Sequence, residues 1–282
     1  MRWPTCRRSP PRRRTCSGTT TSDRRPVPVT DLCAIVLAAG EGRRLRPLTA
    51  DVPKALCPVG NVPLLELALT RLARLGFTGP ERVAVNACYL AEQVVAAVGD
   101  RAYLSVEPGP RPLGTAGGVA RLRDWVAGRG VLVGNADAYL AGGELSPLLA
   151  GWDRGTTRLL GVPAAQRPEF GRYRFAGCSL LPWSRVAGLE PVPTDLVRTV
   201  WRPAEAAGEL TVVEYGGTYL DTGTPRDYLA ANLHALGERD LLVAPDATLT
   251  GDAEQAWPGG YVGPDEHLTD AIRYGRSGTV TG

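Results

Sequence analysis

Short apolar runs alternate with helical patterns from residue 32 onward, and this alternation restricts the possible folds more than any other feature. The runs are rich in valine, isoleucine and leucine, which is typical of strands buried on both faces; they span 32–37, 82–86, 102–107 and 131–134. Segments with apolar residues at helical spacing lie between them, at 62–75, 91–98 and 115–126. Since parallel strands need crossover connections, we predict an α/β fold with a mostly parallel mixed sheet between two helical layers.

The second half of the chain has a less regular pattern. We predict strands at 158–162 and 172–181, a helix at 195–207, and a strand pair formed by 211–214 with 218–220. A further helix begins after Thr224, which suits the N-cap position, with Pro225 at the first helical position. Short segments with the composition of β-strands, separated by glycine and proline residues, follow at 241–244, 247–250 and 260–262. We therefore divide the chain into a main domain at 31–238 and a small β-rich C-terminal extension at 239–282.

Composition and charge exclude several classes of protein. The net charge is +3, but residues 1–30 carry eight arginines and a single acid, so the remainder is mildly acidic and no nucleic-acid partner is indicated. We expect residues 1–30 to be a disordered Arg/Pro-rich tail, unless a start codon assigned too early accounts for them. No apolar run is long enough to span a membrane, and the scattered cysteines show no disulfide framework. A cytoplasmic location is expected.

Polar and glycine-containing segments follow the predicted strands. Parallel strands bring their carboxyl ends to one edge of a sheet, and ligands of such sheets bind outside that edge. The segments expected there are 40–46, Asn86, 107–117 and 135–137. The two histidines, His234 and His267, lie far apart and outside any zinc-ligand spacing. The sequence therefore predicts one ligand site at this edge.

A glycine loop and a solitary lysine suggest that the ligand carries phosphates. Gly40 and Gly42 would expose backbone N–H groups to an anion. Leu45 replaces the third glycine of a dinucleotide fingerprint, and no Gly-Lys-Ser/Thr ending of a P-loop follows. Lysine and arginine together number 32, and only Lys54 is a lysine. A compact ammonium retained among so many guanidinium groups suggests a narrow anionic pocket.

Six ordered motifs resemble the signature of the sugar-1-phosphate nucleotidyltransferases, the NDP-sugar pyrophosphorylases. They are LAAGEGRRLRPLT at 37–49, PKAL at 53–56, PLLE at 63–66, LGTAG at 113–117, NAD at 135–137 and LDTGTPRDY at 220–228. The arrangement is most similar to the mannose-1-phosphate guanylyltransferase branch. The resemblance implies a Rossmann-like three-layer α/β/α fold over 31–238, and transfer of a nucleoside monophosphate from an NTP to a sugar 1-phosphate with release of pyrophosphate.

The resemblance also assigns roles to individual residues. Lys54 is expected at the reacting phosphate, Arg44 on the β- and γ-phosphates, and Asp137 with Asp221 on Mg²⁺, the expected cofactor. The other nucleotide-binding residues are expected to be Leu37, Ala38, Gly40, Gly42, Arg43, Glu107, Gly114 and Thr115. Arg43 replaces a small hydroxyl residue of the family, so it either adds a phosphate contact or points to solvent. Cys57 lies close to Lys54 in sequence, and we expect no chemical role for it.

Base and sugar recognition are less constrained by the sequence. Glu107 would accept hydrogen bonds from N1–H and N2–H₂ of guanine, which favours GTP, although it could simply end a strand. The family lysine that holds the sugar phosphate is missing, and Arg167, Arg172 and Arg174 are alternative cations. The sugar is expected to be mannose-like or heptose-like.

The sequence leaves two other functions and the oligomeric state open. A non-catalytic regulator that senses nucleotide sugars would suit the short sugar loop and the C-terminal extension. A metal-dependent glycosyltransferase is disfavoured, because Tyr139 stands where such enzymes place a second carboxylate two residues after Asp137. The sequence is also compatible with a homo-oligomer.

Overall fold

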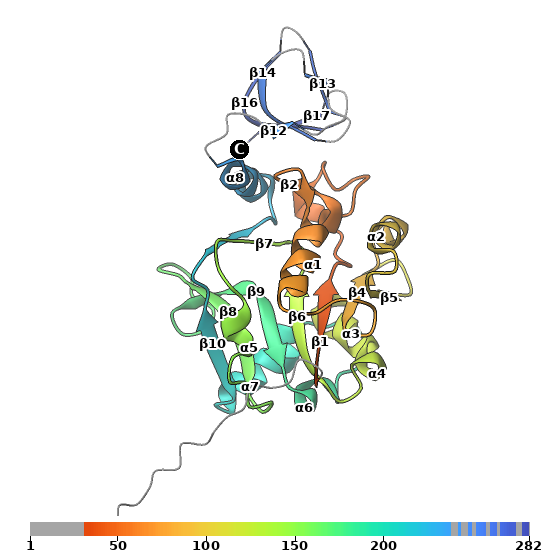
Figure 1. Ribbon diagram of the computed structural model, residues 1–282, viewed down its shortest axis with the longest axis vertical. Coiled ribbons are helices and arrows are strands. Elements are labelled where there is room, and N and C mark those ends of the chain that lie inside the picture. The colour runs from red at the N-terminus through yellow and green to blue at the C-terminus, as the bar shows by residue number, and fades with distance from the viewer. Residues whose placement is uncertain are drawn as a thin grey trace, which may run out of the picture.

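The computed structural model describes residues 31–237, followed by 242–243, 248–249, 252–257, 260–263, 266–274 and 278–281 (Figure 1). The predicted N-terminal tail at 1–30 lies outside the described residues. Within the described part of the chain, no helix is both long and apolar enough to cross a membrane.

A seven-stranded sheet forms the centre of the molecule (Figure 1). In spatial order its strands are β10 (Leu210–Glu214), β8 (Thr157–Pro163), β9 (Tyr173–Leu181), β6 (Gly130–Asn135), β1 (Leu32–Leu37), β4 (Val83–Ala87) and β5 (Tyr103–Val106). All neighbours pair in parallel except at β9, which runs antiparallel to both β6 and β8. The predicted mostly parallel mixed sheet is confirmed.

Helices cover both faces of this sheet because its central strand is apolar on both sides. Alternate side chains of β1 enter different cores: Ala34 and Val36 join one apolar cluster, and Cys33 and Ile35 join the other. The first cluster includes residues of α1 (Leu64–Arg74), α2 (Ala91–Val98) and α5 (Ser146–Leu149). The second includes residues of α3 (Gly114–Arg121), α4 (Arg123–Val126), α6 (Trp183–Val186) and η4 (Val197–Trp201), which continues into α7 (Arg202–Ala206). The α/β/α layering follows from these two cores.

Three sequence predictions differ from the structure in detail. The segments 211–214 and 218–220 do not pair with each other: β10 pairs with β8, and β11 (Thr218–Asp221) pairs antiparallel with β7 (Ala138–Ala141). Strand β5 is not buried on both faces, because it is an edge strand in which Tyr103 and Val106 are exposed. The helix predicted at 115–126 is interrupted at Leu122, between α3 and α4.

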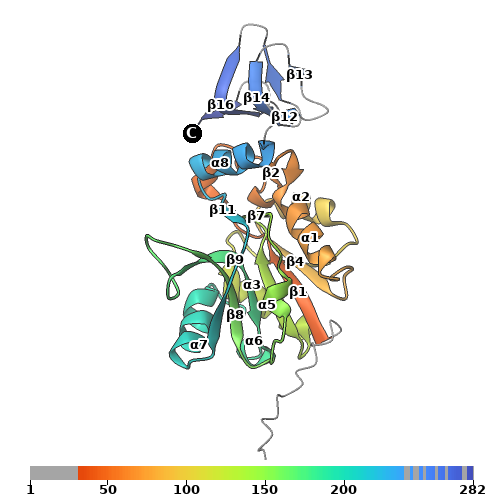
Figure 2. The same ribbon diagram turned by 60° about the vertical axis from the view of Figure 1, so that its left-hand side comes forward.

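A third apolar cluster links the glycine-loop region to the C-terminal strands through α8 (Pro225–Leu236). Thr224 caps this helix by accepting a hydrogen bond from the Asp227 amide at 3.2 Å, as predicted. The α8 helix lies between the main sheet and the C-terminal strands in both views (Figure 2). Those strands are β12 (Leu242–Val243), β13 (Thr248–Leu249), β14 (Asp252–Ala256), β15 (Tyr261–Val262), β16 (His267–Tyr274) and β17 (Gly278–Thr281).

Trp257 attaches the C-terminal strands to α8. Its ring meets Tyr228 of α8 edge to face at a centroid distance of 5.9 Å, and both side chains are buried. Because Tyr228 also donates a hydrogen bond to the Pro58 carbonyl in β2 (Pro58–Val59), which pairs with β3 (Val62–Pro63), this contact ties three segments together.

Replacing Trp257 should therefore destabilise the protein. We expect Trp257→Ala to lower the free energy of unfolding by about 3–5 kcal/mol, because a large buried side chain is lost. Tyr261→Ala removes an exposed aromatic side chain of the same region and should change stability by about 0.5 kcal/mol or less. Urea unfolding measures both, and equal effects would show that Trp257 does not anchor these strands.

Candidate active site

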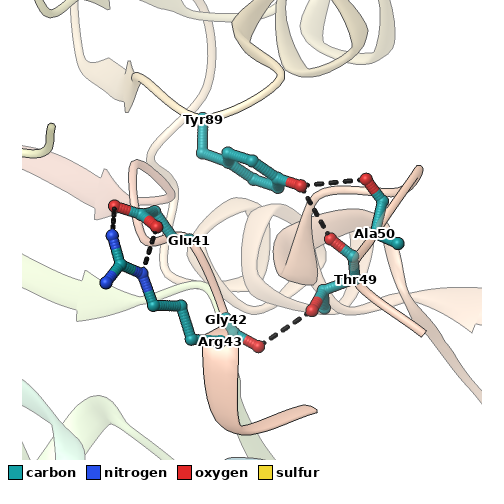
Figure 3. Close-up of polar contacts among 6 residues, drawn as sticks. All are labelled: Glu41, Gly42, Arg43, Thr49, Ala50 and Tyr89. Carbon is teal, nitrogen blue, oxygen red and sulfur yellow. Dashed lines mark hydrogen bonds and ion pairs between the residues drawn. The ribbon is translucent and has the colours of Figure 1, made fainter. Parts of the chain in front are cut away.

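The loop after β1 is held in shape by contacts with the segment at 49–50. Gly42 has a φ of 61°, and a Cβ there would stand 3.0 Å from both Lys54 Cβ and Thr49 Cγ2, so a side chain would be strained. The Thr49 hydroxyl donates to the Gly42 carbonyl at 2.8 Å. Tyr89 in turn donates to the carbonyls of Thr49 and Ala50, both at 2.9 Å (Figure 3). Contacts within the chain thus fix the position of the loop.

Arg43 pairs with Glu41 of the same loop. Its Nη2 lies 3.0 Å from Glu41 Oε1, and its Nε donates to the other carboxylate oxygen (Figure 3). This hydrogen-bonded pairing lowers the pKa of Glu41. The Arg43 side chain is 67% exposed, and its contact with phosphate stays a prediction.

Lys54 brings a buried ammonium to the carboxyl edge of the sheet. It begins the 3₁₀ helix η3 (Lys54–Leu56), and its Nζ donates to Asp137 Oδ2 at 2.6 Å. Asp137 is the second residue after the end of β6, and the contact joins residues 83 positions apart in the chain. The lysine side chain is 10% exposed and that of Asp137 is 38% exposed. A buried ammonium needs such a partner, and the partner leaves part of its carboxylate facing outward.

Arg44 and Asp221 lie next to the same place. The antiparallel pairing of β11 with β7 sets Asp221 opposite Ala138, one residue after Asp137. A Cβ on Gly223 would stand 2.8 Å from Arg44 Nη2 and 3.1 Å from Asp221 Oδ1, so the guanidinium and this carboxylate share one small space. The buried Thr222 hydroxyl donates to the Asp137 carbonyl at 2.7 Å. Pairing of β11 with β7 therefore brings the second aspartate to the first.

Two adjoining cavities collect most of the predicted site residues. The first is lined by Leu37, Ala38, Ala39, Gly40, Lys54, Ala55, Asn86, Pro112, Gly114, Thr115, Asn135, Ala136 and Asp137. The second is lined by Gly40, Glu41, Gly42, Arg43, Arg44, Lys54, Pro112, Asp137 and Gly223. Lys54 and Asp137 line both, so they stand where the cavities meet. Glu107 and Asp221 are in neither lining set.

The two aspartates have the chemistry expected for a shared Mg²⁺ site. Mg²⁺ is usually held by one or two carboxylates together with substrate phosphates and water, rather than by a complete protein cage. Asp137 is partly exposed beside two cavities, and Asp221 is its neighbour across the β11–β7 pair. Among the described residues, no group of three or more His, Cys, Asp or Glu side chains is arranged so that it could hold a metal ion by itself. The donor set therefore fits a metal that is completed by a phosphorylated ligand.

Glu107 has partners that differ from the predicted one. The side chain is 4% exposed, and both carboxylate oxygens accept hydrogen bonds from the chain itself. Oε1 accepts from Asn86 Nδ2 and Oε2 from the Leu113 amide, each at 2.7 Å. A carboxylate in this position is not presented to a base, so Glu107 no longer supports a preference for guanine. Asn86 was expected at this edge from the sequence, but without a role of its own.

The three arginines considered for the sugar phosphate have different surroundings. Arg172 donates to Glu214 Oε2 at 3.1 Å and to the Tyr173 hydroxyl at 2.8 Å. Arg174 stacks on Tyr219, with its Cζ 5.3 Å from the ring centroid. Burial raises the pKa of Tyr219, and the Asp221 and Asp137 carboxylates raise it further. Tyr219 lies two residues before Asp221 on β11. Arg167 has a φ of 53° and is exposed.

Cys57 is unsuited to a chemical role, in agreement with the sequence. It is fully buried, and its thiol contacts the Pro53 carbonyl at 3.9 Å. Burial raises the pKa of the thiol to about 12, although Lys54 acts in the opposite direction. Such a thiol is neutral at physiological pH and is not a nucleophile.

The edge of the sheet thus gathers a glycine loop, an ammonium, a guanidinium and two carboxylates, a combination suited to a phosphorylated ligand with a divalent cation. The family model for nucleotidyl transferases matches residues 33–175, about half of the 282-residue chain. The chain belongs to the nucleotidyl transferase family.

Individual relatives agree with this assignment. N-acetylmuramate alpha-1-phosphate uridylyltransferase of Neisseria meningitidis serogroup B is 40% identical over 109 residues, which cover 37% of this chain and 46% of that protein. Mannose-1-phosphate guanylyltransferase 1 of Arabidopsis thaliana is 27% identical over 228 residues, 70% of this chain and 62% of that protein. The chain thus spans less than two thirds of either relative.

The fold is also found among solved structures. One of them, named mannose-1-phosphate geranyltransferase, from Thermus thermophilus, matches with a TM-score of 0.61 and 20% sequence identity. The match covers 89% of this chain and 94% of that one. At this level of identity the likeness shows the fold alone, and it confirms the predicted α/β architecture.

Proposed function

We propose that the chain transfers a nucleoside monophosphate from an NTP to a sugar 1-phosphate and releases pyrophosphate. The observation that carries this proposal is the 2.6 Å contact between Lys54 and Asp137 at the point where the two cavities meet. A phosphate oxygen of the sugar 1-phosphate would attack the α-phosphorus as the bond from that phosphorus to the bridging oxygen of the β-phosphate breaks. Catalysis of such a displacement consists of positioning and charge neutralisation.

Basic groups of the loop and of η3 would hold the phosphates. In the proposal the Lys54 ammonium lies against the reacting α-phosphate, since it stands between the two cavities. Arg44 lines the second cavity and would hold the departing β- and γ-phosphates. The amides around Gly40 and Gly42 would add hydrogen bonds to the phosphate oxygens. Mg²⁺ held by Asp137 and Asp221 would neutralise phosphate charge when bound.

The nucleotide that we propose is GTP, on evidence other than Glu107. The Arabidopsis relative that aligns over 70% of this chain is a guanylyltransferase by name, whereas the Neisseria uridylyltransferase aligns over 37%. The proposed sugar is mannose-like or heptose-like. The alternative of a non-catalytic regulator is not carried forward, because neither relative named above is a regulator by name.

We assign the sugar-phosphate contact to Arg174. It lies on β9, whose residues before Cys178 extend beyond the carboxyl end of β6, and its guanidinium stacks on Tyr219, two residues before Asp221 on β11. Arg172 is less suitable because Glu214 already neutralises it.

The activity itself is tested with a matrix of substrates. GTP, UTP, dTTP and ATP are each incubated with mannose, glucose, heptose and N-acetylmuramate 1-phosphates, and pyrophosphate release is measured with Mg²⁺ and with EDTA. We expect release with at least one pair, fastest with GTP, and its loss in EDTA. If no pair releases pyrophosphate, the proposed function is wrong.

The geometry of the cationic side chain at position 54 should determine kcat. Lys54→Arg keeps the charge but replaces a compact ammonium with a broad fork, so we expect kcat to fall about 100-fold or more with little change in the melting temperature. Arg74→Lys, the reverse exchange at an exposed position of α1, is the matched control and should leave kcat unchanged. Near-normal turnover of Lys54→Arg would remove Lys54 from the reacting centre.

Arg174 should affect sugar-phosphate binding more than NTP binding. Arg174→Ala is expected to raise KM for the sugar 1-phosphate about tenfold, through loss of a charge-assisted hydrogen bond, and to change KM for the NTP little. Arg172→Ala, two residues away on the same exposed surface, provides the comparison. If the two variants behave alike, the assignment to Arg174 is incorrect.

A further inference from the structure

A continuous chain of buried hydrogen bonds crosses the carboxyl ends of β1, β4 and β5. The Ala38 amide donates to Asn86 Oδ1 at 2.7 Å, and Asn86 Nδ2 donates to Glu107 Oε1 at 2.7 Å. The second Glu107 oxygen accepts from the Leu113 amide, also at 2.7 Å. Asn86 is 2% exposed and Glu107 is 4% exposed. Two side chains thus connect two backbone amides from distant parts of the sequence.

The two ends of this hydrogen-bond chain adjoin two different segments that line the first cavity. Ala38 stands in the wall formed by the end of β1, with Leu37 and Gly40. Leu113 immediately precedes Gly114 and Thr115, which line the same cavity at the start of α3. Asn86 itself lines the cavity between them. These hydrogen bonds therefore connect the end of β1 with the start of α3, two segments that line the cavity.

The order of donors and acceptors requires a carboxylate at position 107. Both ends are backbone N–H groups, which can only donate. Asn86 must offer its oxygen to Ala38, so its NH₂ group faces position 107. The residue at 107 must then accept on both sides, and a glutamine can accept on only one. Any amide at 107 leaves two donors facing each other.

Helix α3 packs directly against this pair. A Cβ on Gly118 would stand 2.6 Å from Asn86 Nδ2 and 3.1 Å from Glu107 Oε1, so the absence of a side chain there lets the helix approach. The outer side of the same helix start is held separately, because Thr194 donates its amide to the Leu113 carbonyl at 2.9 Å and accepts from the Ala116 amide at 3.2 Å. Loss of the hydrogen bonds to Glu107 would thus shift the start of α3 and its cavity-lining residues without unfolding the helix.

We propose that Asn86 and Glu107 are positioning residues that set the width of the nucleotide pocket by joining two segments that line it, the end of β1 and the start of α3. The inference rests on the proposed function, in that the ligand of this pocket is taken to be a nucleotide. It gives Glu107 a role different from base recognition, and it gives Asn86 a role that the sequence did not suggest.

A reciprocal exchange tests this proposal. Glu107→Gln leaves two donors facing each other, and Asn86→Asp leaves two carboxylates facing each other. The double variant N86D/E107Q restores every pairing: aspartate accepts from Ala38 and from the glutamine NH₂ group, and the glutamine oxygen accepts from Leu113. The double variant also carries the same total charge as the original pair.

Nucleotide affinity is measured by calorimetry at pH 8 without sugar phosphate, using whichever of GTP, UTP, dTTP and ATP binds the full-length wild-type chain most tightly. We expect each single variant to bind about tenfold or more weakly, because each leaves an unsatisfied buried group. The double variant should bind within about threefold of wild type. Glu92→Gln makes the same chemical change at an exposed position of α2 and should bind normally.

The outcomes separate this proposal from the proposed function and from a purely structural role. If the wild-type chain binds none of the nucleotides, the proposed function and this inference both fail. Wild-type binding with unaffected single variants overturns the inference alone. Melting temperatures are recorded in parallel: recovery of thermal stability in the double variant without recovery of affinity would assign the pair to folding and also overturn the inference.

Discussion

The burial of β1 on both faces is the constraint on which the rest of the structure depends. Its backbone pairs with β4 on one side and β6 on the other, and its alternate side chains enter two separate cores. Because both edges of β1 are paired and both of its faces are covered, the residues that follow it leave the sheet at the carboxyl end of the strand. The glycine loop that follows is therefore presented at the edge where β4, β5 and β6 also end.

Electrostatics at that edge are organised by one ion pair between distant segments. Lys54 is buried in a short 3₁₀ helix, and its ammonium is neutralised by Asp137, which remains partly exposed. Arg44 and Asp221 lie close by, so cations and carboxylates are interleaved rather than gathered into single-sign patches. Interleaving of this kind can hold a polyphosphate together with its counterion. The solitary lysine of the sequence thus stands at the centre of the arrangement.

Much of the fold and part of the site could be predicted because local patterns specify them. The strand at Leu32–Leu37 and the helix at Ala91–Val98 occupy their predicted ranges, since the first is a continuous apolar run and the second has apolar residues at helical spacing. The pairing of 211–214 with 218–220 was wrong, because neighbouring segments in sequence have separate partners in space. Glu107 lies at the predicted edge of the sheet, but its carboxylate oxygens accept hydrogen bonds from the Asn86 side chain and the Leu113 backbone amide. The sequence did not indicate these partners.

The sequence by itself determined the α/β class, the family, and the presence of a phosphate-type loop beside a unique lysine. These features depend on hydrophobic patterns and on the order of the motifs, both of which are visible in the linear sequence. Only the tertiary structure decided which carboxylate neutralises Lys54, which strand brings Asp221 to Asp137, and what Glu107 accepts from. Those choices depend on contacts between segments up to 85 residues apart, such as the one from Thr222 to Asp137. Packing selects such contacts by excluding water and requiring every buried polar group to find a partner.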